Sequence, residues 1–359
     1  MPKLTGLRVL DLSQFLPGPA LTLMLADHGA EVIKIEPPTG DPARTMAPFE
    51  AGHGFWFRNL NRGKQSLPLD LKTPEGKARL TALIATADVF VEGFRPGVIA
   101  RLGFDYDTVS ALNPAIIYCS ISAFGQTGSM AHHPAHDMGA QALAGFLSVN
   151  DGPDGTPVVP GVPAADMAAG LTGAIAVLMA LHARHTSGRG DYIDLAMFDS
   201  LLPWCAHIAG PALTDGIAPT SATGRSLGGH PFYNIYRTSD SRHITLCGRE
   251  PKFSTNLLTA LARPDLIPLA HSEAGPHHAP LTAFLTETFL ERTRDQWTAW
   301  FHHHDVAYAP VLDFREALTQ PLIAERGLVV HADGGHHLAP AIRFTGEPAW
   351  QPAEAPILS

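Results

Sequence analysis

The chain has 359 residues, which is enough for two domains, and its 45% of hydrophobic residues is ordinary for a folded protein. Its formal net charge is −9 with no block of Lys or Arg, so we expect neither nucleic acid nor a membrane as a partner. No signal-peptide pattern opens the chain, and three widely spaced cysteines are typical of a reducing compartment, so we expect a cytoplasmic protein.

The first part of the chain alternates strand and helix patterns. A short apolar run at 7–12, a helical pattern at 20–28 and a strand at 31–36 form a βαβ unit. The pattern continues with a helix at 73–86, strands at 89–91 and 116–121, a long helix from Asp166 to about 184 and a strand at 192–196. This alternation predicts an α/β fold with a parallel sheet covered by helices. The apolar stretch 171–183 is too short to span a bilayer and predicts a buried core helix.

The later part of the chain has a different character. Residues 212–229 are rich in Thr, Ser, Gly and Pro, which predicts a linker. Apolar runs at 232–236 and 243–247 flank a Ser-Asp-Ser turn and predict a β-hairpin. A capping box at 293–296 opens an amphipathic helix. We therefore predict a second, smaller α+β domain.

Three familiar kinds of site have no support in the sequence. The first βαβ unit places Glu36 where a ribose ligand would lie, but the turn at 16–19 reads Leu-Pro-Gly-Pro and lacks the G-x-G-x-x-G pattern of a nicotinamide site. No G-x-S-x-G elbow indicates a hydrolase. The 19 histidines fall in adjacent runs at 132–133, 277–278, 302–304 and 336–337. Neighbours on a helix point to different faces, so we predict solvated surface histidines and no metal site.

Asp166 stands at the start of the long helix and is followed by the mostly small residues 167–170. Taken alone, an Asp in that place indicates a helix cap, which is common in any protein. The small residues leave room for a substrate, and free N–H groups at the helix start can bind a developing oxyanion. On these residues alone the helix cap remains the favoured interpretation of Asp166, and a catalytic role stays open.

A series of motifs resembles the class III CoA-transferases, the CaiB–BaiF group. The matching segments, in chain order, are GLRVLDL at 6–12, GP at 18–19, DHGAEVIKIE at 27–36, NRGK at 61–64, LDLK at 69–72, EGFRPG at 92–97, RLG at 101–103, GQTG at 125–128, AD at 165–166 and SGRG at 187–190. The resemblance covers nearly the whole chain. It implies an enzyme that acts on acyl-CoA thioesters.

The resemblance also implies an architecture. We expect a Rossmann-like, CoA-binding large domain at 1–210, a small α+β domain at 226–310 and a C-terminal segment at 311–359 that returns to the large domain. Members of the family form interlocked homodimers, with the active site between the large domain of one subunit and the small domain of the other. That arrangement would bring Glu250 of one subunit to His136 of its partner.

Two chemistries occur in that family, and both use the Asp that matches Asp166. Transferases use it as a nucleophile that forms an anhydride and then an aspartyl-CoA thioester. α-Methylacyl-CoA racemases use it as one of two bases, together with a His-Asp pair and a Glu-Pro-x-Phe segment. This sequence has His136-Asp137 and Glu250-Pro251-Lys252-Phe253, so it resembles the racemase branch at both places.

We therefore predict a racemase or epimerase of 2-methylacyl-CoA thioesters, with His136 and Asp166 as the two bases. A His and an Asp differ enough in pKa to hold one proton between them near neutrality. A carboxylate such as Glu250 beside His136 would fix the imidazole tautomer and raise its basicity. The segments 61–66 and 166–170 are more typical of transferases. The alternatives are a transferase that moves CoA between carboxylic acids, and an inactive acyl-CoA-binding protein.

Coenzyme A is expected as part of the substrate, with no tightly bound cofactor. The resemblance points to Arg95, Arg101 and Lys72 near its phosphates and adenine, and to Leu69 and Phe94 along the adenine. Cations suit the pyrophosphate and the 3′-phosphate of CoA.

Overall fold

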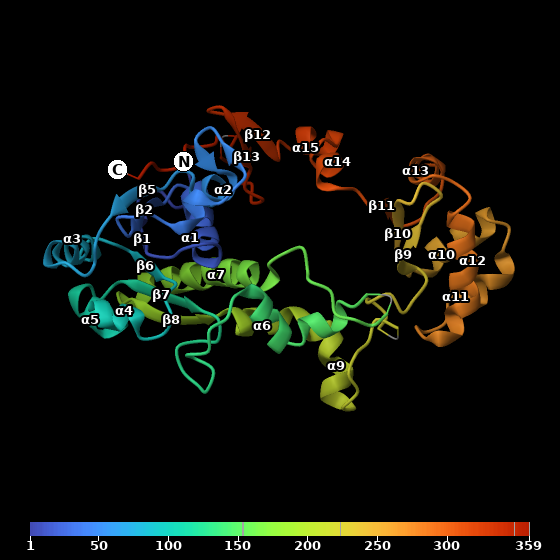
Figure 1. The fold of residues 1–359 in the computed structure, drawn as a ribbon, viewed down its shortest axis with the longest axis horizontal. Coiled ribbons are helices and arrows are strands. Elements are labelled where there is room, and N and C mark those ends of the chain that lie inside the picture. Colours follow the sequence, from blue (N-terminus) through green and yellow to red (C-terminus); the bar gives the residue numbers. More distant parts are fainter. Residues whose placement is uncertain (153, 223, 348, 359) are drawn as a thin grey trace. The chain divides into compact units, whose positions relative to one another are not determined.

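The computed structural model describes residues 1–152, 154–222, 224–347 and 349–358, which fold into two compact units (Figure 1). The first unit comprises Met1–Ala144, Gly161–Trp204 and Gln320–Ser359. The second comprises Gly145–Pro160 and Cys205–Thr319.

The first unit is built on a six-stranded parallel sheet. Its strands are β1 (Arg8–Asp11), β2 (Glu31–Glu36), β5 (Gln65–Pro68), β6 (Val89–Glu92), β7 (Ile117–Ser122) and β8 (Asp191–Ala196). Their order is β5-β2-β1-β6-β7-β8, and each neighbouring pair is parallel. The chain order therefore reverses between β1 and β6, which is the topological switch point of a Rossmann-like sheet.

Helices cover both faces of this sheet (Figure 1). The helices of the first unit are α1 (Pro17–Asp27), α2 (Phe55–Asn61), α3 (Pro74–Ile84), α4 (Val98–Leu102), α5 (Tyr106–Leu112), α6 (Asp137–Leu143), α7 (Ala164–Ser187), α8 (Met197–Leu201) and α15 (Pro321–Glu325). On one face, buried side chains of β1, β2, β6 and β7 pack with those of α3, α4 and α5. On the other face, α1 packs against α7. The predicted parallel α/β fold is thus confirmed.

Two short hairpins complete the first unit. They are β3 (Phe49–Glu50) with β4 (His53–Gly54), and β12 (Val329–Ala332) with β13 (Gly335–Leu338). Glu50 joins them, because its carboxylate accepts a 2.7 Å hydrogen bond from the backbone N–H of His336 and lies 2.6 Å from Nδ1 of that residue. This contact attaches the C-terminal hairpin to the N-terminal part of the chain.

Helix α7 is longer and less buried than the sequence predicts. By length and composition alone, this helix could cross a membrane, but the core helices of folded proteins meet the same criterion. Half of its most apolar stretch of 18 residues is buried in the fold. One face carries exposed apolar side chains at helical spacing, namely Leu171, Ile175, Leu178 and Met179. We call these four residues the α7 apolar stripe. The prediction of a buried core helix is therefore correct for only one side of α7.

The second unit holds a three-stranded antiparallel sheet, and side chains from helices within 251–301 pack with it in one core. The strands are β9 (Tyr233–Arg237), β10 (His243–Cys247) and β11 (Tyr308–Pro310), in the order β11-β10-β9. The helices are α9 (Ala206–Thr214), α10 (Pro251–Ala260), α11 (Ile267–Ala270), α12 (Ala279–Phe289), α13 (Arg294–Phe301) and α14 (Phe314–Leu318). The predicted hairpin and the capping box at Thr293 are confirmed. The predicted linker begins too early, because α9 continues to Thr214.

Candidate active site

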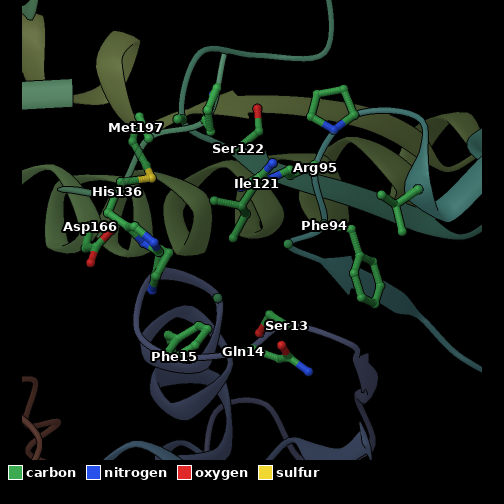
Figure 2. A pocket seen from close by; sticks show the side chains of 18 of the residues that line it. Ser13, Gln14, Phe15, Phe94, Arg95, Ile121, Ser122, His136, Asp166 and Met197 are labelled. Carbon is green, nitrogen blue, oxygen red and sulfur yellow. The ribbon is translucent and has the colours of Figure 1, made fainter. Parts of the chain in front are cut away.

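A cavity of about 500 Å3 lies at the carboxyl ends of β1, β6 and β7, where a doubly wound sheet binds its ligands (Figure 2). Its wall consists of segments that follow these strands, namely residues 13–15 after β1, 93–96 after β6 and 121–123 at the end of β7. The loop 131–136 before α6 and residues of four helices complete the wall, namely Pro17 and Gly18 of α1, Val98 of α4, Asp166 of α7 and Met197 of α8. All of these residues belong to the first unit.

Asp166 is the only acidic residue in the described wall of this cavity. It is not the helix cap, because α7 begins at Ala164 and Pro163 occupies the N-cap position. Among the described residues, the Asp166 carboxylate has no hydrogen-bond partner. Burial, together with the nearby charge of Asp137, raises its pKa to about 7. Within the described residues, the carboxylate is therefore unpaired and available to a ligand.

Asp137, the first residue of α6, provides the cap that Asp166 does not. Its Oδ1 atom accepts hydrogen bonds from the backbone N–H groups of Ala165 at 2.8 Å and Asp166 at 3.1 Å. Its Oδ2 atom accepts one from the side chain of Gln141. The expectation that these N–H groups are free to bind an oxyanion is therefore wrong, because a carboxylate already occupies them.

His136 lines the same cavity from the N-cap position of α6. Its side chain is exposed, and its ring meets the ring of Phe15 edge to face, with centroids 6.5 Å apart. Figure 2 shows His136 and Asp166 near each other on the left of the view, and Phe94 on the right. The structure thus brings two predicted site residues, Asp166 and His136, to one cavity. A third, Asp137, lies behind the wall, where it accepts from the backbone N–H of Asp166.

A buried ionic network fixes the turn between β1 and α1. The Nζ atom of Lys64 donates to Asp11 at 3.0 Å and to the hydroxyl of Thr22 at 2.8 Å. Asp11 accepts from the backbone N–H of Ser13, and Lys34 Nζ donates to the carbonyl of Ser13 at 3.0 Å. Although burial opposes ionisation, Lys64 and Lys34 hold the pKa of Asp11 well below its usual range. Ser13, in the cavity wall, is thereby held from both sides.

Glu92 fixes a second part of the wall from behind. It is the last residue of β6, is 1% exposed, and its Oε2 atom accepts a 2.8 Å hydrogen bond from the backbone N–H of Phe94. Burial raises its pKa to about 7. The segment that carries Phe94 and Arg95 is therefore tied to the end of the central sheet.

The residues predicted to bind coenzyme A are only partly brought together. Phe94 and Arg95 line the cavity, and Phe94 and Leu69 both pack against the core next to α3–α5. Lys72 and Arg101 have exposed side chains and do not line the cavity. Their predicted role remains a prediction.

Glu250 belongs to the second unit, where it occupies the N-cap position of α10 with an exposed side chain. His136 and Asp166 belong to the first unit. The predicted support of His136 by Glu250 remains a prediction.

Several cavity residues were not predicted from the sequence. Ser13, Gln14 and Phe15 follow β1, and the only sequence signal near them is the Pro-Gly-Pro turn that ends the segment. His132 and His133 are exposed as predicted, but they also line the cavity. The same prediction is wrong for His278 and His337, which are buried. Across the described ranges, no group of three or more His, Cys, Asp or Glu is arranged to hold a metal ion.

Comparison with known proteins identifies the family of this chain. The sequence model of CoA-transferase family III matches residues 4–359. An acetyl-CoA:oxalate CoA-transferase of Acetobacter aceti is 34% identical over 92% of this chain and 86% of its own length. A succinate–glutarate CoA-transferase of Agrobacterium fabrum is 36% identical over 92% of this chain and 85% of its own length.

A solved structure agrees with these relatives. The crystal structure of a CaiB/BaiF family protein from Brucella suis superposes with a TM-score of 0.86 and 32% identity, over 99% of this chain and 96% of that protein. Fold, motifs and relatives therefore lead to one conclusion: the chain belongs to CoA-transferase family III, the CaiB/BaiF family.

Proposed function

We propose that this protein is a CoA transferase that moves CoA between carboxylic acids, with Asp166 as the nucleophile. The observation that carries the proposal is the position of Asp166, an acid without a hydrogen-bond partner in the described fold, in the cavity at the switch point of the sheet. The relatives with CoA-transferase names support the same chemistry. They support the transferase alternative rather than the predicted racemase.

The proposed reaction exchanges acyl groups on Asp166 in four balanced steps. The Asp166 carboxylate attacks the thioester carbonyl of the donor, which forms a mixed anhydride and releases CoA thiolate. The thiolate attacks the aspartyl carbonyl, which forms an aspartyl-CoA thioester and releases the donor acid. The acceptor carboxylate then attacks this thioester and releases CoA thiolate again. The thiolate finally attacks the acceptor carbonyl of the second anhydride, which gives the new thioester and restores the Asp166 carboxylate.

The charge of the cavity supports small dicarboxylic acids as substrates. Relatives are named for oxalate, glutarate and mesaconate. Besides Arg95, which is proposed below to hold coenzyme A, the described wall carries His132 and His133, and Asp166 is its only acid. Basic side chains of this kind can hold the carboxylate that does not react, while the other carboxylate meets Asp166. Ser122, whose hydroxyl lacks a partner among the described residues, supplies a further donor in the wall.

We further propose that Leu69, Lys72, Phe94, Arg95 and Arg101 hold coenzyme A. Phe94 and Arg95 in the cavity wall support this part of the proposal. The protein is proposed to work as a homodimer. The exposed α7 apolar stripe supports this proposal, because a second subunit that packs on this face of α7 would remove its apolar side chains from water. The three cysteines, Cys119, Cys205 and Cys247, are free, which supports a reducing, cytoplasmic location.

Proton transfer at the α-carbon is a second candidate, because His136 and Asp166 line one cavity. A racemase would place deuterium on a 2-methylacyl-CoA in D2O without any acceptor acid, and His136→Ala would remove most of this exchange. In that candidate Glu250, on the partner subunit, supports His136, so Glu250→Gln would weaken the exchange less. A transferase gives no such exchange.

The direct experiment is an assay for transfer with a panel of acids. Acetyl-CoA or succinyl-CoA is incubated with oxalate, glutarate, mesaconate or a monocarboxylate of matched length, and new thioesters are identified by mass spectrometry. We expect transfer to at least one dicarboxylate and much less to its monocarboxylate partner. Asp166→Asn should lower the rate at least about a thousandfold while the protein stays folded. A folded Asp166→Asn variant with full activity would refute the assignment.

A further inference from the structure

Phe15 has a backbone conformation that a bulky residue rarely adopts. Its φ angle is +62°, in the left-handed region, where a side chain crowds the backbone and where glycine is usually found. Among the other described residues that are not glycine, Ala51, Ser241, Ala262 and Asp333 also have positive φ, but none of them lines the active-site cavity. Strained residues of this kind persist where the surrounding structure holds them, and they cluster at functional sites.

The neighbours of Phe15 explain how the conformation is held. On one side, Asp11 and Lys34 fix the backbone of Ser13 through the buried network. On the other side, α1 begins at Pro17, and a Cβ atom on Gly18 would lie 2.2 Å from Cβ of Ser13. The chain therefore turns tightly between Ser13 and Gly18, and Phe15 lies inside that turn.

The ring of Phe15 is placed where the proposed chemistry happens. It lines the cavity and meets the ring of His136 edge to face, at an interplanar angle of 82°. Figure 2 shows Phe15 beside the segment of Ser13 and Gln14, in the cavity that also holds His136 and Asp166. A large apolar ring at this place positions the imidazole and displaces water from the wall.

We propose that Phe15 is a positioning residue that orients His136 and shields the acyl intermediates on Asp166 from water. The inference rests on the proposed transferase function. Without the ring, water attacks the aspartyl-CoA thioester, so that CoA thiol leaves and the Asp166 carboxylate returns with no transfer to the acceptor. The strained conformation is the means by which the turn directs an aromatic ring into the cavity.

Three substitutions test the proposal. Phe15→Ala removes the ring and keeps the strain, Phe15→Gly removes both, and Phe15→Tyr keeps an aromatic ring. We expect the ratio of thioester hydrolysis to transfer to rise at least about tenfold in the Ala and Gly variants, and to stay within about twofold of wild type in Phe15→Tyr. The Gly variant should melt at a higher temperature than the Ala variant, because glycine fits the left-handed conformation. A folded Phe15→Gly protein with the wild-type ratio would overturn the shielding role.

A second measurement separates this inference from the proposed function. The NMR signal of the His136 ring proton on Cε1, assigned with the His136→Ala variant, should shift when Phe15→Gly removes the neighbouring aromatic ring. An unchanged signal would overturn the positioning role. If the wild-type protein transfers no CoA to any acid, the proposed function fails and the shielding role fails with it. The NMR comparison then still decides whether Phe15 positions His136.

Discussion

The environment of Asp166 sets the pH at which its carboxylate, the proposed nucleophile, is ionised. Burial and the charge of Asp137 raise its pKa to about 7, and only the ionised carboxylate can attack a thioester. We expect kcat/KM for transfer to rise roughly tenfold per pH unit below about pH 6 and to level off above about pH 8. Steady-state kinetics across this range, with Asp166→Asn as the background, measures the profile. A profile that is flat down to about pH 5 would show an ordinary carboxylate.

Asp137 has two separable effects on Asp166, one through its charge and one through its hydrogen bonds. Asp137→Asn removes the charge but keeps an oxygen that can accept from the N–H groups of Ala165 and Asp166. Its pH profile should move to lower pH, with the free energy of unfolding within about 1 kcal/mol of wild type. Asp137→Ala also leaves both N–H groups without an acceptor. Its free energy of unfolding, measured in urea, should therefore be lower by a further 1–2 kcal/mol or so. Equal stability of the two variants, or an unmoved profile in Asp137→Asn, would contradict this account.

At the residue scale, the sequence identified part of the candidate site, but the relatives support transfer of CoA rather than the predicted racemisation. Asp166, His136 and Asp137 were predicted; the first two line one cavity, and Asp137 accepts a hydrogen bond from the backbone of Asp166. The capping role was assigned to the wrong carboxylate, because the partner of the helix start is distant in sequence. Phe15 was not predicted, because nothing in a Phe side chain marks a left-handed backbone. That conformation follows from the buried network around Ser13.

At the scale of elements, the connection between α7 and β8 illustrates two different uses of glycine. Gly188 ends α7 with φ at +67° and has open space around its missing side chain. Gly190 precedes β8, and a Cβ atom there would lie 1.8 Å from the carbonyl oxygen of Ile116. Gly188 is needed for its left-handed backbone conformation, whereas Gly190 is needed because two backbone segments approach closely there.

These two glycines make a matched pair of substitutions. Gly188→Ala should cost roughly 1–2 kcal/mol of the free energy of unfolding, because an L-residue is strained in the left-handed region. Gly190→Ala should cost more than about 3 kcal/mol, because a backbone carbonyl cannot move aside as a side chain can. Urea titration followed by circular dichroism measures both. A Gly190→Ala protein as stable as Gly188→Ala would show that the backbone at Gly190 does not approach Ile116 as described.

Most strands and helices of the sheet were predictable, because their hydrophobic periods are regular and their ends are marked. Thr73 caps α3 as predicted, with its hydroxyl accepting from the N–H of Gly76. The sequence could not predict that one face of α7 is exposed, because apolar residues occur on all sides of this helix. An apolar face that packs in the core and one that packs against another subunit have the same composition. Which face of α7 is buried depends on the elements that pack against it, and these are distant in sequence.

At the scale of the whole molecule, the α7 apolar stripe carries a prediction about assembly. Met179 is 66% exposed and Ile175 52% exposed, which is unfavourable for large apolar side chains left in water. We expect a homodimer at micromolar concentration in sedimentation velocity experiments. Ile175→Glu together with Met179→Glu should weaken the dimer, whereas Arg189→Glu, on an exposed residue beyond the stripe, should not. A stable and active wild-type monomer would contradict the proposed dimer.

The central claim is that Asp166 carries the acyl group and CoA during turnover, and trapping that intermediate tests it most directly. Wild-type protein is mixed with a donor acyl-CoA without an acceptor acid and treated with hydroxylamine or borohydride. Peptide mass spectrometry then locates the modified residue. We predict a hydroxamate or a reduced side chain at Asp166, and none in Asp166→Asn. Transfer by the wild-type enzyme with no modification at Asp166, or with modification at another residue, would contradict the account.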